Sequence, residues 1–283
     1  MEGTMEKSEN RVPPTIVEST LNSVYALFRY YYDFIIIFLN VLFLKGNPTI
    51  VNRGPIFNNK IVIIGDDIAA GVGDIDALLH IKGIASPLAL QLRKNTRIKQ
   101  TWRIYSCGVV GSTSEEWLPT SEKKNDKTTH FETVFNNPKY ADAKIVIIFL
   151  GFNDERNGSL SADDTYENIV AISKVLTNMG KPVYICPVPT HADHLVSDEL
   201  YGNNLRRNEL LDLYTDNETR PLIFKGPQIH GLNYEYKGDF LYAPDAQHFS
   251  PRGYVKIAKD FEDLLENHMV RIEFKQFKEK LNI

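Results

Sequence analysis

The sequence predicts an α/β protein, a three-layer α/β/α sandwich built around a parallel sheet. Between residues 59 and 270, short runs that are apolar throughout alternate with longer amphipathic segments, which is typical of buried parallel strands joined by helices. Glycine and polar residues directly follow several of these runs, where sheets of this kind bind ligands. An apolar segment at residues 24–44 precedes this region and predicts an N-terminal apolar helix.

Composition sets the class of protein. The chain has 283 residues, 43% of them hydrophobic and 24% charged, which fits one large globular domain with extensions. A net charge of −4 gives no basic footprint for nucleic acid. The 2 cysteines, Cys107 and Cys186, exclude a disulfide framework and fit a reducing compartment, where we expect both to be buried apolar fillers.

Five segments of the predicted domain have the pattern of strands. Most are runs of apolar or β-branched residues that end at or near a glycine or a cysteine. They are residues 60–65, 101–107, 144–151, 182–188 and 221–226.

The predicted helices lie between these strands and after the last one. They cover residues 77–93, interrupted near Pro87, then 161–178 and 198–214. The final helix has the clearest start, because Ser250 is a good N-cap and Pro251 fits the first turn. Its apolar residues then follow helical spacing and are Tyr254, Ile257, Ala258, Phe261, Leu264 and Leu265.

The N-terminal part divides into a polar tail at 1–23 and an apolar helix with its linker at 24–58. Residues 24–44 are long enough to cross a bilayer, although Arg29, Asp33 and Asn40 interrupt them. Tyr30, Tyr31 and neighbouring tyrosines resemble an interfacial aromatic belt. The segment predicts contact with membrane lipid or with a membrane protein complex. The alternative is a helix packed on the protein's own domain.

These features predict an intracellular, membrane-associated protein. The organelle stays open, mitochondria included, although the acidic residues of the tail are untypical of a mitochondrial presequence. The predicted domain spans 59–270, and residues 271–283 form a basic C-terminal tail. No cofactor is expected.

Four short motifs follow predicted strands or precede the final helix, in this order along the chain. They are Gly65-Asp66-Asp67, the loop after Cys107 that contains Gly111, Gly151-Phe152-Asn153-Asp154, and Asp245-Ala246-Gln247-His248. Because the carboxyl ends of parallel strands meet at one edge of a sheet, we expect these motifs to converge.

The four motifs, in this order, resemble the blocks of the SGNH (GDSL-type) hydrolase superfamily, which has a flavodoxin-like sandwich. The resemblance extends from about Asn59 to Met269. It implies that Gly111 and Asn153 are oxyanion donors, that His248 is the general base and that Asp245 orients it. The nucleophilic serine of the family is replaced by Asp67, so serine-esterase chemistry should be lost.

The substitution leaves four interpretations. The first is a non-catalytic binding or scaffold module at a membrane, with Asp67 filling the oxyanion site, pairing with protonated His248 and leaving room for a small acyl ligand. The second is an ester or lipid-ester hydrolase that tolerates the change or uses another nucleophile. Ser106, Ser112 and Ser114 are near in sequence. The third is a hydrolase in which Asp67 attacks saturated carbon. The fourth is a cation site made by the oxygens of Asp66, Asp67, Asn153 and Asp154.

Several polar residues have simpler structural roles as well. We expect Asp66 to cap the turn after the first strand and Asp154 to bond to local backbone. His191 and His194 have near-helical ligand spacing but no third ligand in their motif, so no metal site is predicted.

Overall fold

The computed structural model describes most of the predicted domain and little of what precedes it. The described residues are 49–53, 56–74, 83–119, 128–189, 197–229, 241–245 and 247–282, with Val24, Leu27, Phe28, Tyr30, Tyr31, Tyr32 and Ile35.

A six-stranded sheet forms the centre of the described chain, in the order β1-β3-β2-β4-β5-β6. The strands are β1 (Ile50–Val51), β2 (Asn58–Gly65), β3 (Thr101–Ser106), β4 (Ile145–Phe149), β5 (Val183–Ile185) and β6 (Ile223–Lys225). Strands β3 to β6 pair in parallel with β2 or with each other, as predicted, but β1 is antiparallel to β3. The sheet is therefore mixed, and the prediction of a purely parallel sheet is wrong at this edge.

The missed strand has a simple physical explanation. Ile50 and Val51 lie in the segment predicted as a linker, and two residues are too few to show a strand period. Val51 is nevertheless fully buried against β3, opposite Trp102. The chain thus joins the sheet before the first predicted strand.

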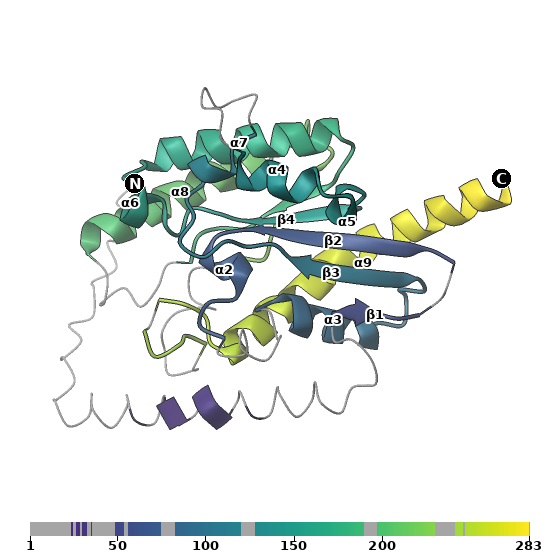
Figure 1. Ribbon diagram of the computed structural model, residues 1–283, viewed down its shortest axis with the longest axis horizontal. Helices are drawn as coiled ribbons and strands as arrows, with labels where there is room; N and C mark the ends of the chain where they lie inside the picture. The colour runs from purple at the N-terminus through teal and green to yellow at the C-terminus, as the bar shows by residue number, and fades with distance from the viewer. Residues whose placement is uncertain are drawn as a thin grey trace, which may run out of the picture.

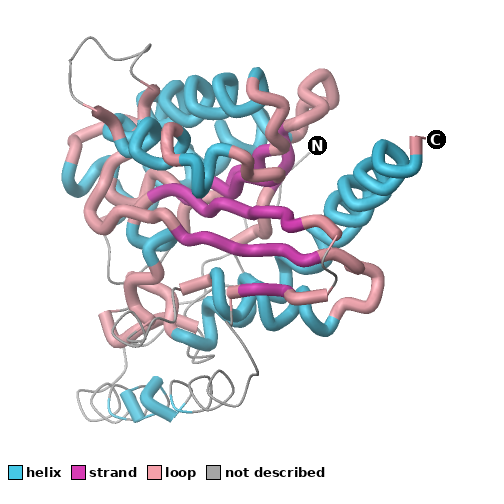
Figure 2. The backbone as a smooth tube through the Cα atoms, turned by 45° about the vertical axis from the view of Figure 1, so that its right-hand side comes forward, coloured by secondary structure: helices cyan, strands magenta, loops and turns pink. Residues whose placement is uncertain are grey.

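Helices cover both faces of the sheet, which makes the predicted three layers (Figure 1). On one face lie α3 (Ala85–Lys94) and α9 (Pro251–Leu281), and on the other lie α4 (His130–Phe135), α7 (Ala162–Asn178) and α8 (Asp198–Thr215). Figure 2 shows the strands between these helices. Short helices occupy the loops: α2 (Asp67–Ala70), η2 (Glu115–Trp117), α5 (Pro138–Ala141) and α6 (Asp154–Asn157).

The sheet divides the apolar core into two clusters because its central strands are buried on both faces. Ile61 and Ile63 of β2 face one cluster, and Val62 and Ile64 face the other. All four are fully buried, as expected for a parallel strand covered by helices on both sides.

The C-terminal helix α9 is longer than predicted and includes most of the predicted basic tail. Ser250 caps it as expected, since its side chain accepts a hydrogen bond from the Gly253 amide. Within the tail, Glu273 is only 4% exposed and accepts hydrogen bonds from Trp102 Nε1 at 2.8 Å and from the Gln100 amide at 3.0 Å. The last turns of the helix project beyond the sheet (Figures 1 and 2).

Most of the predicted apolar helix at 24–44 lies outside the described residues. The seven described residues of that segment have helical conformation. Tyr30 is buried, and its hydroxyl donates a hydrogen bond to the Gly73 carbonyl oxygen at 2.5 Å. Among the helices of the described residues, none combines the length and the apolar character needed to span a bilayer.

One other predicted boundary shifts. In the predicted helix 77–93, residues 77–82 lie outside the described chain, and α3 begins at Ala85. Pro87 therefore stands in its first turn, where a missing amide costs little.

Candidate active site

The turn after β2 places Asp66 and Asp67 at the carboxyl edge of the sheet. Gly65 adopts a φ of +138°, and a Cβ there would lie 1.6 Å from the Phe149 carbonyl oxygen of β4, so only glycine fits. Asp66 caps α2, because its carboxylate accepts hydrogen bonds from the Ile68 amide at 3.1 Å and the Phe152 amide at 3.0 Å. The predicted capping role of Asp66 is confirmed.

Asp67 is the first residue of α2, and its carboxylate meets two other predicted site residues. Its Oδ1 accepts a hydrogen bond from the Gly111 amide at 2.5 Å. Its Oδ2 lies 3.3 Å from His248 Nε2. The two side chains are 10% and 13% exposed, respectively, so the pair is largely screened from water but not sealed.

His248 is held from its other side by Asp245. Asp245 Oδ2 lies 2.6 Å from His248 Nδ1, while Oδ1 accepts the backbone amides of Gln247 and His248, each at 3.0 Å. The Phe152 ring packs against the imidazole at 4.9 Å between centroids. These contacts fix the ring with Nε2 directed at Asp67.

The two predicted oxyanion donors come from the loops after β3 and β4. Gly111 has a φ of +77°, which directs its amide toward Asp67. Asn153 is buried at 4% exposure, its Nδ2 is 3.4 Å from the Ser112 carbonyl oxygen, and its side chain helps to lower the pKa of Asp67. All five predicted site residues thus meet at one place.

The charges of this site are strongly coupled. Burial alone would raise the pKa of Asp67, but hydrogen bonds from His248, Gly111 and Asn153 outweigh it and hold that pKa below 3.8. Burial likewise opposes a charge on His248, yet the bonds to Asp245 and Asp67 raise its pKa to about 9. Burial would also raise the pKa of Asp245, but its hydrogen bonds with His248 and Gln247 lower that pKa to about 2. At neutral pH the site therefore holds an imidazolium between two carboxylates.

The neighbouring aspartate behaves in the opposite way. Burial raises the pKa of Asp66 to about 8, with smaller contributions from the charges of Asp67 and Asp154. The two hydrogen bonds that Asp66 accepts from backbone amides oppose this shift but do not cancel it. Adjacent carboxyl groups thus differ in charge at neutral pH, because Asp66 is fully buried whereas His248 and Gly111 stabilise the charge of Asp67.

Asp154 connects the two loops that carry Gly111 and Asn153. It is fully buried and accepts hydrogen bonds from the Ser114 amide at 2.7 Å, the Ser114 hydroxyl at 2.6 Å and the Thr165 hydroxyl at 2.6 Å. The prediction that Asp154 bonds to local backbone is therefore wrong, because the amide it binds is 40 residues away. Its role is still structural.

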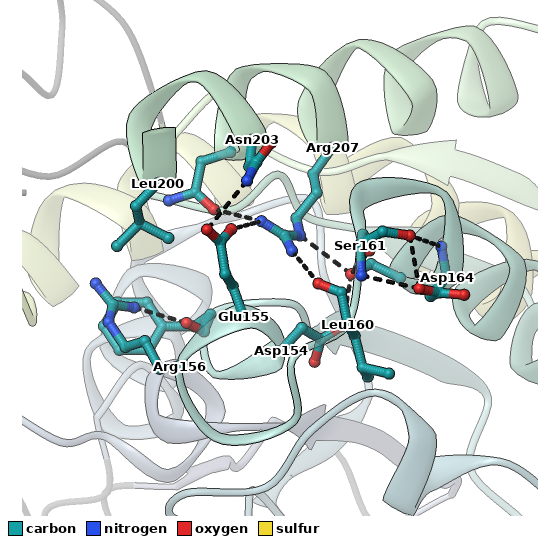
Figure 3. A network of polar contacts seen from close by, with 12 residues as sticks. Asp154, Glu155, Arg156, Leu160, Ser161, Asp164, Leu200, Asn203 and Arg207 are labelled. Carbon is teal, nitrogen blue, oxygen red and sulfur yellow. Dashed lines mark hydrogen bonds and ion pairs between the residues drawn. The ribbon is translucent and has the colours of Figure 1, made fainter. Parts of the chain in front are cut away.

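Arg207 of α8 extends this network. Its buried guanidinium contacts Thr165 Oγ1 at 3.1 Å, Glu155 Oε2 at 3.0 Å and the Leu160 carbonyl oxygen at 2.6 Å. Figure 3 shows Glu155 and Leu160 converging on Arg207. Sequence analysis missed Arg207, because no motif distinguishes it from the exposed Arg206 beside it in α8.

The three nearby serines do not substitute for the missing nucleophile. Ser106 donates its hydroxyl to the Ala69 carbonyl oxygen, Ser112 donates to Val109 and accepts from Trp117, and Ser114 donates to Asp154. Each hydroxyl is thus hydrogen-bonded within the surrounding loops. The imidazole of His248 lies against Asp67 and Asp245 instead.

The cation interpretation fits the geometry poorly. Within the described ranges, no group of three His, Cys, Asp or Glu side chains is arranged to hold a metal ion. Asp154, one of its four proposed ligands, is saturated by Ser114 and Thr165. His191 and His194 lie outside the described residues.

Comparisons with known proteins identify the fold. No family model and no curated protein matches the sequence. A lipase/acylhydrolase from Enterococcus faecalis has a TM-score of 0.52 at 16% identity, over 74% of this chain and 96% of that one. A psychrotrophic esterase from Pseudoalteromonas gives 0.51 at 14%, over 75% and 98%.

A third structure is larger than the present chain. A GDSL-like lipase from Bacteroides ovatus has a TM-score of 0.51 at 13% identity, and the match covers 76% of this chain but 54% of that lipase. The described domain therefore has the fold of GDSL-type lipases and esterases.

Proposed function

We propose that this chain is an SGNH hydrolase-like protein without serine-esterase activity that serves as a membrane-associated binding or scaffold subunit. One observation carries the proposal. The Asp67 carboxylate accepts the Gly111 amide and pairs with His248, so it occupies the groups that an ester's developing oxyanion would need.

Two chemical reasons exclude serine-type catalysis at this site. A carboxylate that attacks an acyl ester gives a mixed anhydride in place of a stable acyl-enzyme, and it adds charge where charge must develop. In addition, a base must be neutral to take a proton, whereas His248, with a pKa of about 9, is protonated at neutral pH. A small acyl compound could then only bind.

Membrane association is the second part of the proposal. The described side chains of the N-terminal segment that are exposed are all apolar or tyrosine: Val24, Leu27, Phe28, Tyr31, Tyr32 and Ile35. Tyr30 faces the domain instead and binds Gly73. A helix with such an outward face binds a bilayer surface or a membrane protein. The two free cysteines fit a reducing compartment, so we place the protein inside the cell.

A second candidate is a hydrolase that uses Asp67 itself as nucleophile. The observation that favours it is the unbroken chain from Asp245 through His248 to Asp67, with 2.6 Å and 3.3 Å between the bonded atoms.

The loss of esterase activity is tested by reversion. We expect native protein not to hydrolyse p-nitrophenyl acetate, and Asp67→Ser to hydrolyse it, because the nucleophile alone is worth on the order of 10⁶-fold in serine hydrolases. Asp67→Asn is the matched control, since it removes the charge without supplying a hydroxyl. Hydrolysis by native protein that fluorophosphonate does not inhibit would contradict the inactive interpretation and favour the second candidate.

Membrane binding is tested with the full chain and vesicles of neutral and anionic lipid. Phe28→Ser together with Ile35→Ser should reduce the fraction that floats with vesicles. Leu213→Ser is the control, because Leu213 is 73% exposed on α8, outside the proposed surface. Equal flotation of the two variants would contradict a lipid-binding role for this face.

A further inference from the structure

We propose that the Asp67–His248 pair hydrolyses an electrophile at saturated carbon, with an epoxide as the favoured substrate class. This inference rests on the second candidate function and names its substrate class. Three features of the site carry it: the two different environments of the Asp67 oxygens, the donors around Oδ1, and the alignment of His248 with Asp245.

The two oxygens of Asp67 are set up for different tasks. Oδ1 is held by the Gly111 amide at 2.5 Å, while Oδ2 is directed toward His248 Nε2 at 3.3 Å. A carboxylate nucleophile needs one oxygen that can attack and a second oxygen whose charge is stabilised when its ester is later cleaved. The Gly111 amide supplies that second requirement, and Asn153 contributes by favouring the charged form of the same carboxylate.

The first step forms an ester on Asp67. Asp67 Oδ2 attacks one epoxide carbon, a new O–C bond forms, and the C–O bond of the ring breaks with its electron pair going to the ring oxygen. That oxygen takes the Nε2 proton of His248 and becomes a hydroxyl group. His248 is neutral after this step, and Asp67 no longer carries a charge.

The second step cleaves the ester with water. Neutral His248 removes a proton from water as the water oxygen bonds to Cγ of Asp67, and the resulting charge on Oδ1 is held by Gly111 and Asn153. Collapse breaks the bond between Cγ and Oδ2, and the departing alkoxide takes the carboxyl proton to give a diol. Asp67 is again a carboxylate and His248 an imidazolium, so the sum is epoxide plus water to diol.

The charges of the resting site fit this class better than an acyl ester. An epoxide needs an acid for its ring oxygen, and the imidazolium held by Asp245 and Asp67 is that acid. Removing the charge of Asp67 also removes one of the contacts that favour protonated His248, so the ring becomes a better base once the ester has formed.

The experiment uses full-length native protein with styrene oxide and 1,2-epoxyhexane. We expect diol formation, with a rate that falls about 10²–10⁴-fold in His248→Gln, because a general acid–base group contributes that much. In heavy-oxygen water, the first turnover should label the carboxylate of Asp67 and leave the diol unlabelled. Asp67→Asn should form no diol.

A trapping measurement keeps the test decisive. With 1-bromohexane, whose leaving bromide needs no proton, His248→Gln should accumulate one hexyl group that peptide mapping places on Asp67. The inference is overturned if neither epoxide gives a diol and no adduct forms on Asp67, or if the label appears only in the diol. Because these assays use no acyl ester and no vesicles, their failure is distinct from failure of the binding function.

Discussion

Two buried carboxylates of the molecule are used in different ways. Asp154 is fully buried, and Ser114 and Thr165 saturate it with neutral donors behind the loops of the site. Asp67 is slightly exposed and has a backbone amide on one oxygen and a charged imidazole at the other. Both follow a buried strand, so position in the fold alone does not separate them.

The difference lies in what the partners can do. Ser114, Thr165 and, behind them, Arg207 hold Asp154 in one arrangement and offer no proton to exchange at neutral pH. His248 can both lose and accept a proton, and it is itself positioned by Asp245. A buried carboxylate of this kind has a structural role when its partners keep their protons. It can take part in a reaction when one of its partners can gain or lose a proton.

The largest expected effect is on stability, from removing Asp154. Asp154→Ala leaves the Ser114 amide and hydroxyl buried without their acceptor, although Thr165 keeps the Ser161 carbonyl oxygen at 3.0 Å, so we expect the free energy of unfolding to fall by about 3–5 kcal/mol. Asp67→Ala should cost about 1 kcal/mol or less, because water can reach the Gly111 amide. Urea denaturation measures both, and equal losses would remove the distinction.

Glu273 extends the comparison to a carboxylate far from the site. It accepts the Trp102 indole and the backbone amides of Lys99 and Gln100. We expect Glu273→Ala to lower the free energy of unfolding by about 2–3 kcal/mol, since the Trp102 indole and the Gln100 amide would stay buried and unpaired. Thermal unfolding measures this loss, with Glu279→Ala on the same helix as a control that should be near neutral.

The pH dependence of stability should separate the titrating site from the fixed network. His248 has a pKa of about 9 in the folded protein against 6.5 otherwise, so its contribution is complete below pH 6.5 and is lost as the pH rises through about 9. Asp66 also makes the protein less stable as the pH rises from 3.8 to about 8, because its pKa is raised in the folded state. Native protein should therefore lose more stability than His248→Gln between pH 6.5 and 9.

Urea titrations at closely spaced pH values would show this, together with the imidazole pKa measured by NMR. Asp66 is present in both proteins, so the difference between them reports on His248 alone. Identical slopes would mean that His248 is paired with neither Asp245 nor Asp67 in solution.

The smallest effect should come from an exposed carboxylate. Asp142 is 60% exposed and pairs with Lys60 at 2.6 Å, which lowers its pKa despite some burial. We expect Asp142→Ala to change the free energy of unfolding by about 0–1 kcal/mol, and less at high salt. A loss as large as that of Asp154→Ala would show that the contribution of these carboxylates to stability does not follow their exposure to solvent.

The sequence was sufficient to predict most of the fold because the central strands are apolar on both faces and Ser250 marks the last helix. It could not show β1, since Ile50 and Val51 are too short for a period. It also placed Glu273 in a basic tail, because residues 271–283 contain one arginine and several lysines, and no local motif shows that a glutamate among them is buried.

The site residues were found through motifs that each follow a strand or precede a helix. Arg207 could not be found in this way, because its partners Glu155, Leu160 and Thr165 are more than 40 residues away in the chain. Asp154 was singled out, but its partners depend on how two loops pack. Contacts between loops are set by the assembled sheet, and a motif within one loop does not contain them.

The glycine at the end of β2 has a consequence for protein engineering. A side chain at residue 65 would collide with the Phe149 carbonyl oxygen, whereas the side chain of residue 67 bonds to Gly111 and His248 through its carboxylate. In a library randomised at both positions, we expect nearly all folded members to retain glycine at 65, while many residues are accepted at 67. New nucleophiles can thus be selected at one position without redesigning the backbone that presents them.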